Sequence, residues 1–191
     1  MAETQGWARM RDMSVALLER RTGAGVEEWN RRIKESGADT DERALRGWLR
    51  GQGVAGYAQQ MLVFERFGYP DYLVATPDQL IDGQYADRPA LKPILDRIVS
   101  VAGGLGDVRV QARKGYVTLV SPRRTFALIR ASTKKRVDLG FRLANRPPGG
   151  RLQVAGRMPQ GWATLKFELA SPDDVDAEVE QVLAETYRAN S

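Results

Sequence analysis

Apolar residues in the first third of the chain recur at spacings of three and four, which is the repeat of an amphipathic helix. The pattern predicts four short helices, over residues 13–22, 23–37, 39–52 and 54–68. In the second of these, Val26, Trp29 and Ile33 form one apolar stripe. Glycines separate the segments and act as helix stop signals. A small helical bundle over residues 10–68 is expected.

The repeat changes to two after residue 106, where apolar and polar residues alternate as they do in a half-buried strand. In the segment RVDLGFRL (136–143), Val137, Leu139, Phe141 and Leu143 share one face, and the residues between them are polar or glycine. Strands are expected at 107–113, 116–122, 124–132, 135–143 and 162–171, with a short edge strand at 151–156. Short turns connect most of them, so a mostly antiparallel sheet is expected.

Helical segments stand on both sides of the strands, at 89–106 and 171–190, the latter opening with the capping pair Ser171-Pro172. Two amphipathic helices can cover the apolar face of one sheet. The predicted fold class is therefore α+β: an N-terminal helical bundle, a linker at 69–84, and a C-terminal two-layer sandwich at 85–191 with its N- and C-terminal helices flanking the sheet. The other sheet face is left open.

The amino-acid composition limits the kinds of site that this chain can form. The 191 residues carry a net charge of +5, with no cysteine and no histidine. Disulfides, thiolate chemistry, histidine-dependent triads and typical zinc sites are excluded, and no cofactor or metal is expected. The missing cysteines, the absence of an apolar run long enough for a membrane span and the lack of a signal-like N-terminus favour a cytoplasmic protein.

Two segments resemble known families. Residues 13–66, with TG before VEEWNRRIKESG and then ALRGWLRGQGVAGYAQQMLV, resemble the bacterial domain of unknown function family 4287. Residues 85–190, with YADRPALKPILDRI, KGYVTLV, FALIRASTKKRVDLGFRL and ELASPDDVDAEVEQVLAETY, resemble domain of unknown function family 5655. The resemblance implies a fusion of the two in this order and carries no established reaction. Members of the second family are attached to nuclease-like domains, which favours a nucleic-acid context.

The open sheet face is the first candidate site, because it and its turns collect cations that a phosphate backbone requires. The competing interpretation is an ordinary solvated face of an antiparallel sheet. The candidate nucleic-acid-binding residues are Arg109, Arg113, Lys114, Arg123, Arg124, Lys134, Lys135, Arg136, Arg142 and Lys166. Asp138 lies among them and is expected to pair with Arg136 or Arg142 across strands.

A pocket between the two domains is the alternative, because aromatic side chains supply the walls of small-molecule sites. Its candidate residues are Tyr72, Tyr116, Phe126 and Trp162. This alternative describes a non-catalytic protein that sequesters a small molecule. A homodimer that covers the charged face is a further possibility.

Two other interpretations are weaker. Residues 41–67 have the lengths of a helix-turn-helix, but the second helix offers only Gln59 and Gln60 to read bases. The acids of SPDDVDAEVE match the usual start of a helix, and no phosphate-binding glycine loop follows a strand. We therefore expect a binding protein rather than an enzyme, with nucleic acid as the first choice of partner.

Overall fold

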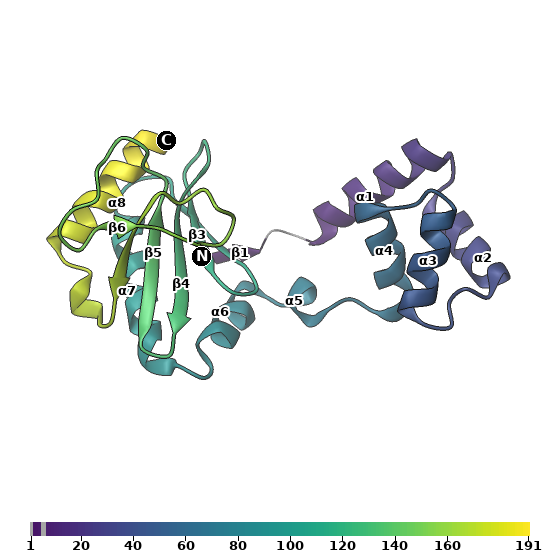
Figure 1. Ribbon diagram of the computed structural model, residues 1–191, viewed down its shortest axis with the longest axis horizontal. Coiled ribbons are helices and arrows are strands. Elements are labelled where there is room, and N and C mark those ends of the chain that lie inside the picture. Colours follow the sequence, from purple (N-terminus) through teal and green to yellow (C-terminus); the bar gives the residue numbers. More distant parts are fainter. Residues whose placement is uncertain (1, 5–6) are drawn as a thin grey trace. The chain divides into compact units, whose positions relative to one another are not determined.

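The computed structural model describes residues 2–4 and 7–191 and divides into two compact units (Figure 1). Residues 7–74 form the N-terminal unit. The C-terminal unit joins residues 2–4 to the chain from Ala75 to Ser191. The predicted α+β class is confirmed.

The N-terminal unit is helical. Its helices are α1 (Trp7–Thr22), α2 (Val26–Ser36), α3 (Glu42–Gly51), α4 (Gly56–Phe67) and the short α5 (Asp71–Val74). The predicted stripes form its core, in which Trp29 and Ile33 of α2 pack with leucines of α1, α3 and α4. Gly37 ends α2 in the left-handed region, at φ 64°, where glycine carries no steric penalty.

The C-terminal unit is a sheet with helices. Before the sheet come α6 (Pro77–Tyr85), the 3₁₀ turn η1 (Pro89–Leu91) and α7 (Lys92–Gly103). The strands are β1 (Ala2–Thr4), β2 (Arg109–Ala112), β3 (Val117–Val120), β4 (Thr125–Thr133), β5 (Arg136–Phe141), β6 (Gln153–Val154) and β7 (Leu165–Leu169). The 3₁₀ turn η2 (Pro172–Asp174) and α8 (Ala177–Asn190) follow.

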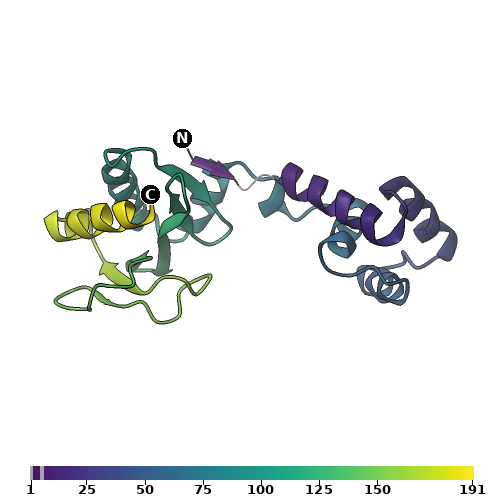
Figure 2. The same ribbon diagram turned by 90° about the horizontal axis from the view of Figure 1, so that it is seen from above.

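The sheet has the strand order β1-β2-β3-β4-β5-β7-β6 and is antiparallel except where β1 joins β2. Its inner face carries Leu119, Ile129, Leu139 and Phe167, which form the core with α7 and α8. Figures 1 and 2 show α7 and the connection from β6 to β7 on opposite sides of this sheet. We call the face away from α7 the outer face.

The outer face is only partly open, because the connection at 155–164 folds over it. Ala155, Met158 and Ala163 bury Leu128 of β4 in a second, smaller core. Gly140 of β5 makes room for this cover, since a Cβ atom there would lie 2.6 Å from Met158 Cε. The connection at 155–164, called the cover below, therefore occupies the middle of the outer face, which the sequence predicted to be open.

Residues 69–84, which the sequence assigns to a linker, contain helices α5 and α6. A capping box between Thr76 and Gln79 starts α6, and Pro77 stands at its first position. Helix α6 packs against β1 and β2, so the chain from Ala75 onward belongs to the C-terminal unit.

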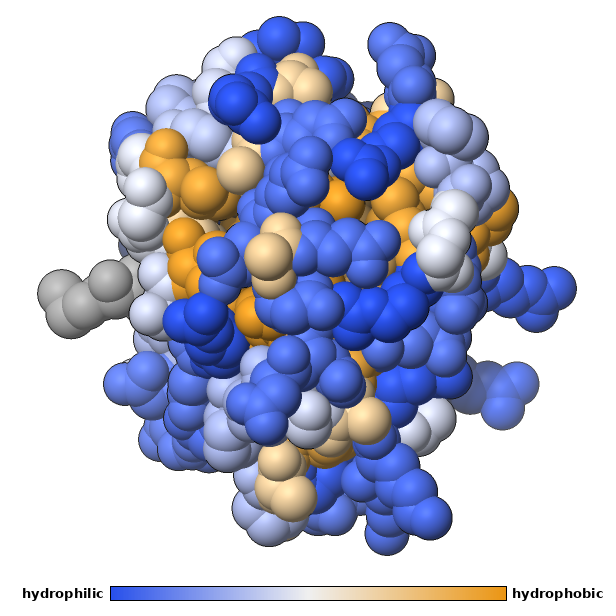
Figure 3. Space-filling model, turned by 90° about the vertical axis from the view of Figure 1, so that its left-hand side faces the viewer, coloured by the Kyte–Doolittle hydropathy of each residue, from blue (hydrophilic) through white to orange (hydrophobic). Residues whose placement is uncertain are grey.

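Figure 3 shows one side of the surface, where hydrophilic residues surround smaller hydrophobic areas. In the C-terminal unit, Val154 of the edge strand β6 is 65% exposed. No helix within the described ranges has both the length and the apolar character needed to cross a bilayer.

Tyr85 at the end of α6 places a hydroxyl in the core. The residue is 2% exposed and its hydroxyl has no hydrogen-bond partner among the described residues. Burial raises the pKa of Tyr85 to about 12, and the Asp96 carboxylate acts in the same direction. The folded state therefore favours the neutral phenol more strongly than the unfolded state does.

Tyr85→Phe is expected to flatten the alkaline loss of stability. In the wild type this stabilisation is complete below pH 10 and declines as the pH rises towards about 12, because the unfolded tyrosine ionises first. Urea unfolding of both proteins between pH 8 and about 11.5 measures the difference. Parallel pH profiles for wild type and Tyr85→Phe would contradict this account.

Candidate functional site

The C-terminal unit separates its charges along the sequence. Between Arg109 and Lys166 the chain has 14 lysines and arginines and one acid, Asp138. From Phe167 to the C-terminus it has seven acids and one cation, Arg188. The first segment forms β2–β6, their turns and the start of β7; the second contains most of β7, η2 and α8. The sheet is therefore strongly cationic, and the segment that ends in α8 is acidic.

The single acid of the cationic segment lies at the centre of a charge network on the outer face. Asp138 is 5% exposed and stands opposite Glu168 in the register of β5 and β7. Lys166 Nζ lies 3.3 Å from Asp138 Oδ2 and 2.6 Å from Glu168 Oε1. Arg136 donates to Glu168 Oε2 at 2.7 Å, and its Nε lies 2.9 Å from Asp138 Oδ1 without hydrogen-bond alignment. We call these four residues the charge ring.

The charge ring satisfies two of the predicted phosphate-binding cations internally. Hydrogen bonding from Lys166 lowers the pKa of Glu168 against the opposing effect of burial, and Arg136 adds to the lowering. Two cations and two carboxylates leave no net charge. Arg136 and Lys166 therefore hold β5 and β7 together, and their cationic charge is already balanced.

Arg142 lies at one end of the outer face without a carboxylate. Its guanidinium stacks on Trp162 at 4.6 Å from the ring centroid, and its Nε donates to the Thr125 carbonyl at 3.0 Å. Burial lowers the pKa of Arg142, and the nearby Arg124 guanidinium lowers it further. Two guanidinium groups that repel each other form a favourable place for an anion.

The turns carry the remaining exposed cations. Arg123 and Arg124 are in the β3–β4 turn, and Lys134 and Lys135 are in the β4–β5 turn. These turns stand at opposite ends of β4, whose nine residues span about 27 Å. Within the described part of the chain, the side chains of Arg123, Arg124 and Lys135 form no ion pair or hydrogen bond, and Lys134 has only the long-range field of Asp87.

Three further predicted cations lie in β2 or in the turn that follows it. Arg109 is exposed at the start of β2, and Lys114 is exposed in the turn that follows this strand. Arg113 donates to Gln111 at 3.1 Å. These three residues extend the cationic surface beside β3.

The predicted aromatic pocket does not assemble as one site. Phe126 is completely buried and packs on Tyr187, because a bulge at Leu119/Val120 places both Phe126 and Ala127 in the core. Tyr72 belongs to the N-terminal unit. Tyr116 and Trp162 do come together through Gln160, which donates to the Tyr116 hydroxyl at 2.6 Å and accepts from Trp162 Nε1 at 2.9 Å.

Three residues of this surface were not expected from the sequence. Arg130, in the middle of β4, and Arg157, in the cover, form no ion pair with any described residue. Gln160 adopts φ 66°, which is uncommon for a residue with a side chain. The period of β4 places Arg130 beside Leu128, so its position could have been predicted. The path of the cover could not, because no repeat marks it.

The other motifs have structural roles. Gln59 is 8% exposed and donates to the carbonyls of Arg46 and Val54, so it is not available to read a base. Asp174 accepts from the backbone of Ala170 and Ser171, and Asp176 caps α8. No group of three or more acidic side chains suited to a metal ion occurs in the ranges that the structure covers.

Residues 81–190 match the family model described as "Domain of unknown function (DUF5655)". The chain belongs to this family. The match includes α7, β2–β7, α8 and the last residues of α6, and so contains the charge ring and both cationic turns of the DUF5655 domain. No curated protein and no solved structure matches the chain.

Asp138→Asn is expected to lower the free energy of unfolding of this domain by about 3 kcal/mol. Removing one partner of a buried ionic group leaves the other charge uncompensated, and Lys166 is only 13% exposed. Glu168→Gln, in the more exposed half of the charge ring, should lower the free energy of unfolding by clearly less than Asp138→Asn does. Urea denaturation measures both, and a change below about 0.5 kcal/mol for Asp138→Asn would show that the ring contributes nothing.

Proposed function

We propose that this protein binds nucleic acid through the outer face of its DUF5655 domain, without catalysis. The observation that supports this proposal is the charge of the segment from Arg109 to Lys166, where 14 cations accompany one acid and that acid is already paired within the charge ring. Arg146 and Arg151 of this segment pair with acids of the α8 segment, and the cations that remain provide the positive charge that a phosphate-binding surface requires.

The geometry revises which cations contact phosphate. Arg136 and Lys166 are paired in the charge ring, so the contacts come from the two turns that flank β4, with Arg130 between them. The turns are about 27 Å apart, which corresponds to about eight base-pair steps of 3.4 Å. The cover at 155–164 buries Leu128 of β4 between the turns, so a strand or duplex that reaches both turns passes over the cover.

Arg142 and Trp162 supply one further position at the Arg124 end of the face. A phosphate there relieves the repulsion between Arg124 and Arg142, and the exposed Gln160 beside Trp162 offers an amide for hydrogen bonding. These contacts are to backbone charge, so recognition is largely independent of base sequence.

The proposal also includes the family of the N-terminal helices, the cellular compartment and the standing of the alternative function. The N-terminal helices are a domain of family 4287, supported by the VEEWNRRIKESG and ALRGWLRGQGVAGYAQQMLV segments. The protein acts in the cytoplasm, which agrees with its lack of cysteine. The small-molecule alternative has less support, since Phe126 is completely buried in the core and cannot line a pocket.

Fluorescence anisotropy with labelled duplex and single-stranded oligonucleotides over a salt series tests the proposal. Four turn cations predict a log–log salt slope of about −3.6 on duplex DNA. The variant Arg123→Gln/Arg124→Gln/Lys134→Gln/Lys135→Gln is expected to lose most of this slope and to bind at least about 100-fold more weakly at low salt.

The matched control removes four exposed arginines from the N-terminal unit: Arg20→Gln, Arg21→Gln, Arg43→Gln and Arg50→Gln. It should keep the affinity and the slope. An equal loss in both variants would assign binding to overall charge, and no salt-dependent binding by the wild type would make the outer face an ordinary solvated surface.

A further inference from the structure

One cation of the outer face is held in a fixed position at the end of the strands. Arg142 follows β5, and its backbone amide donates to the Phe126 carbonyl at 2.9 Å. Its Nε donates to the Thr125 carbonyl at 3.0 Å, and its guanidinium carbon lies 4.6 Å from the centroid of the Trp162 ring. Its two terminal nitrogens, Nη1 and Nη2, form no hydrogen bond with any described residue, so they remain available to an anion.

Arg124 supplies a second guanidinium group at the same place. It directly precedes Thr125, whose carbonyl holds Arg142, and its exposed side chain forms no ion pair or hydrogen bond within the described ranges. The charge of Arg124 adds to the effect of burial in lowering the pKa of Arg142, so the two groups repel each other. Together they offer two positive charges and several N–H donors to one anion.

A phosphate at the end of a strand matches this pair better than one inside a strand. A phosphodiester carries one negative charge, whereas a phosphate monoester carries about 1.5 to 2 negative charges at pH 7. The monoester also presents three strong acceptor oxygens, which arginine binds in two-point fashion. Two guanidinium groups without a carboxylate therefore balance the charge of a terminal phosphate and exceed that of a phosphodiester.

The last turn of α8 disfavours the continuation of an anionic strand past this position. Ser121 of the β3–β4 turn donates to the Asn190 carbonyl at 2.6 Å, so the C-terminal end of α8 lies against this turn. The carbonyl groups at a helix C-terminus carry the equivalent of about half a negative elementary charge. A strand that comes from the β4–β5 turn therefore ends most favourably at Arg142.

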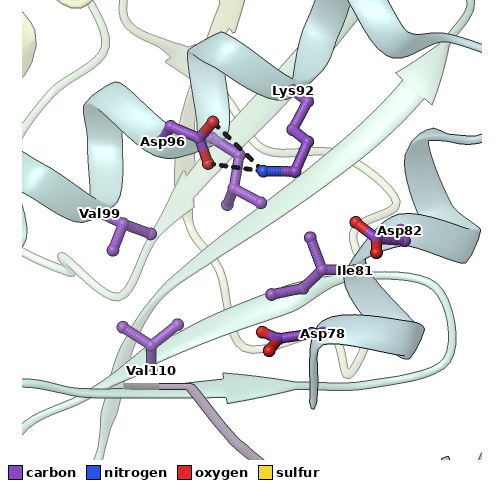
Figure 4. Close-up of a pocket in the computed structure, with 8 residues that line it drawn as sticks. Asp78, Ile81, Asp82, Lys92, Asp96, Val99 and Val110 are labelled. Carbon is purple, nitrogen blue, oxygen red and sulfur yellow. Dashed lines mark hydrogen bonds and ion pairs between the residues drawn. The ribbon is translucent and has the colours of Figure 1, made fainter. Parts of the chain in front are cut away.

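The pocket between α6 and α7 does not suit the same phosphate. It has a volume of about 450 Å³, and Asp78, Asp82 and Asp96 are among the residues that line it (Figure 4). The lysine that lines it, Lys92, is already bound to Asp96, with its Nζ 3.2 Å from Oδ1. An anion in this pocket would meet a net negative charge, which leaves Arg124 and Arg142 as the better position.

We propose that Arg124 and Arg142 bind the terminal phosphate of a nucleic-acid strand. The free nitrogens of the two guanidinium groups donate to the phosphate oxygens, and Trp162 holds the plane of Arg142. The rest of the strand lies on the other cations of the outer face. This inference rests on the proposed nucleic-acid binding and adds a preference for phosphorylated ends.

Competition between a labelled oligonucleotide and three unlabelled oligothymidylates, followed by anisotropy, tests this inference. One strand has a 5′-phosphate, one has a 3′-phosphate, and one has hydroxyl groups at both ends. The hydroxyl strand is two nucleotides longer, so all three have about the same total charge. One phosphorylated strand should bind at least about tenfold more tightly than the hydroxyl strand, and the preferred end gives the direction of the bound strand.

Two variants remove one guanidinium group each. Arg142→Gln should bring the ratio between the phosphorylated and hydroxyl strands close to one, and Arg142→Lys should restore it only in part, because an ammonium lacks the two-point geometry. Arg124→Gln should also reduce the ratio, and it changes a side chain without contacts among the described residues, so the fold is retained. The matched control, Lys134→Gln/Lys135→Gln, should weaken all three strands alike and keep the ratio.

Equal affinity of the wild type for the three strands overturns this inference while leaving the proposed function in place. An unchanged ratio in Arg124→Gln and Arg142→Gln overturns it too, as does an equal loss of the ratio in the Lys134→Gln/Lys135→Gln control. If none of the three strands competes and the labelled oligonucleotide itself does not bind, the proposed function fails, and this inference fails with it.

Discussion

A carboxylate that is almost completely removed from water, on the outer face of a sheet, organises the DUF5655 domain. Asp138 stands between Arg136 and Lys166, and Glu168 closes the charge ring. A buried carboxylate is tolerated only when cations compensate it. The ring thereby stabilises the register of β5 against β7 and leaves no net charge on the part of the outer face next to the cover. Whatever an anionic partner contacts must therefore lie around the ring, at the turns and along β4.

The cover at 155–164 completes this division of the outer face. It packs Met158 and Ala163 over Gly140, next to the charge ring, and holds Trp162 beneath Arg142. One part of the face thus becomes a small apolar core, and another becomes a cationic margin. Acids of the α8 segment pair with cations from the β5–β7 connection, as Arg151 does with Asp176 at the N-cap of α8.

Periodicity predicted most of the fold, because burial of one face imposes a repeat of two or 3.6 residues on any regular element. The stripes around Trp29 and the alternation from Val137 to Leu143 appear in the structure as expected. Where no repeat operates, the sequence was less informative. Helix α6 begins with a capping box, but its packing on β2 depends on contacts across the fold that a proline-containing segment does not reveal.

Prediction of the candidate site from the sequence was limited in the same way. Arg136 and Lys166 were correctly placed on the outer face, but a count of cations cannot show that Asp138 and Glu168 are close enough to pair with them. Phe126 was assigned to a pocket because it is aromatic, and the bulge beside Val120 places it in the core. The cations of the turns were easier to predict, because short charged connections between strands are exposed in almost any arrangement.

Mapping of backbone amide shifts while an unlabelled oligonucleotide is added to isotope-labelled protein tests the central claim most directly. The account predicts that the largest shifts occur at residues 121, 123–124, 133–135 and Arg130, with smaller shifts at 157–158 and 160–162 and almost none in α7 and α8. Shifts concentrated on α7, α8 or the N-terminal helices, with the two turns unchanged, would contradict it.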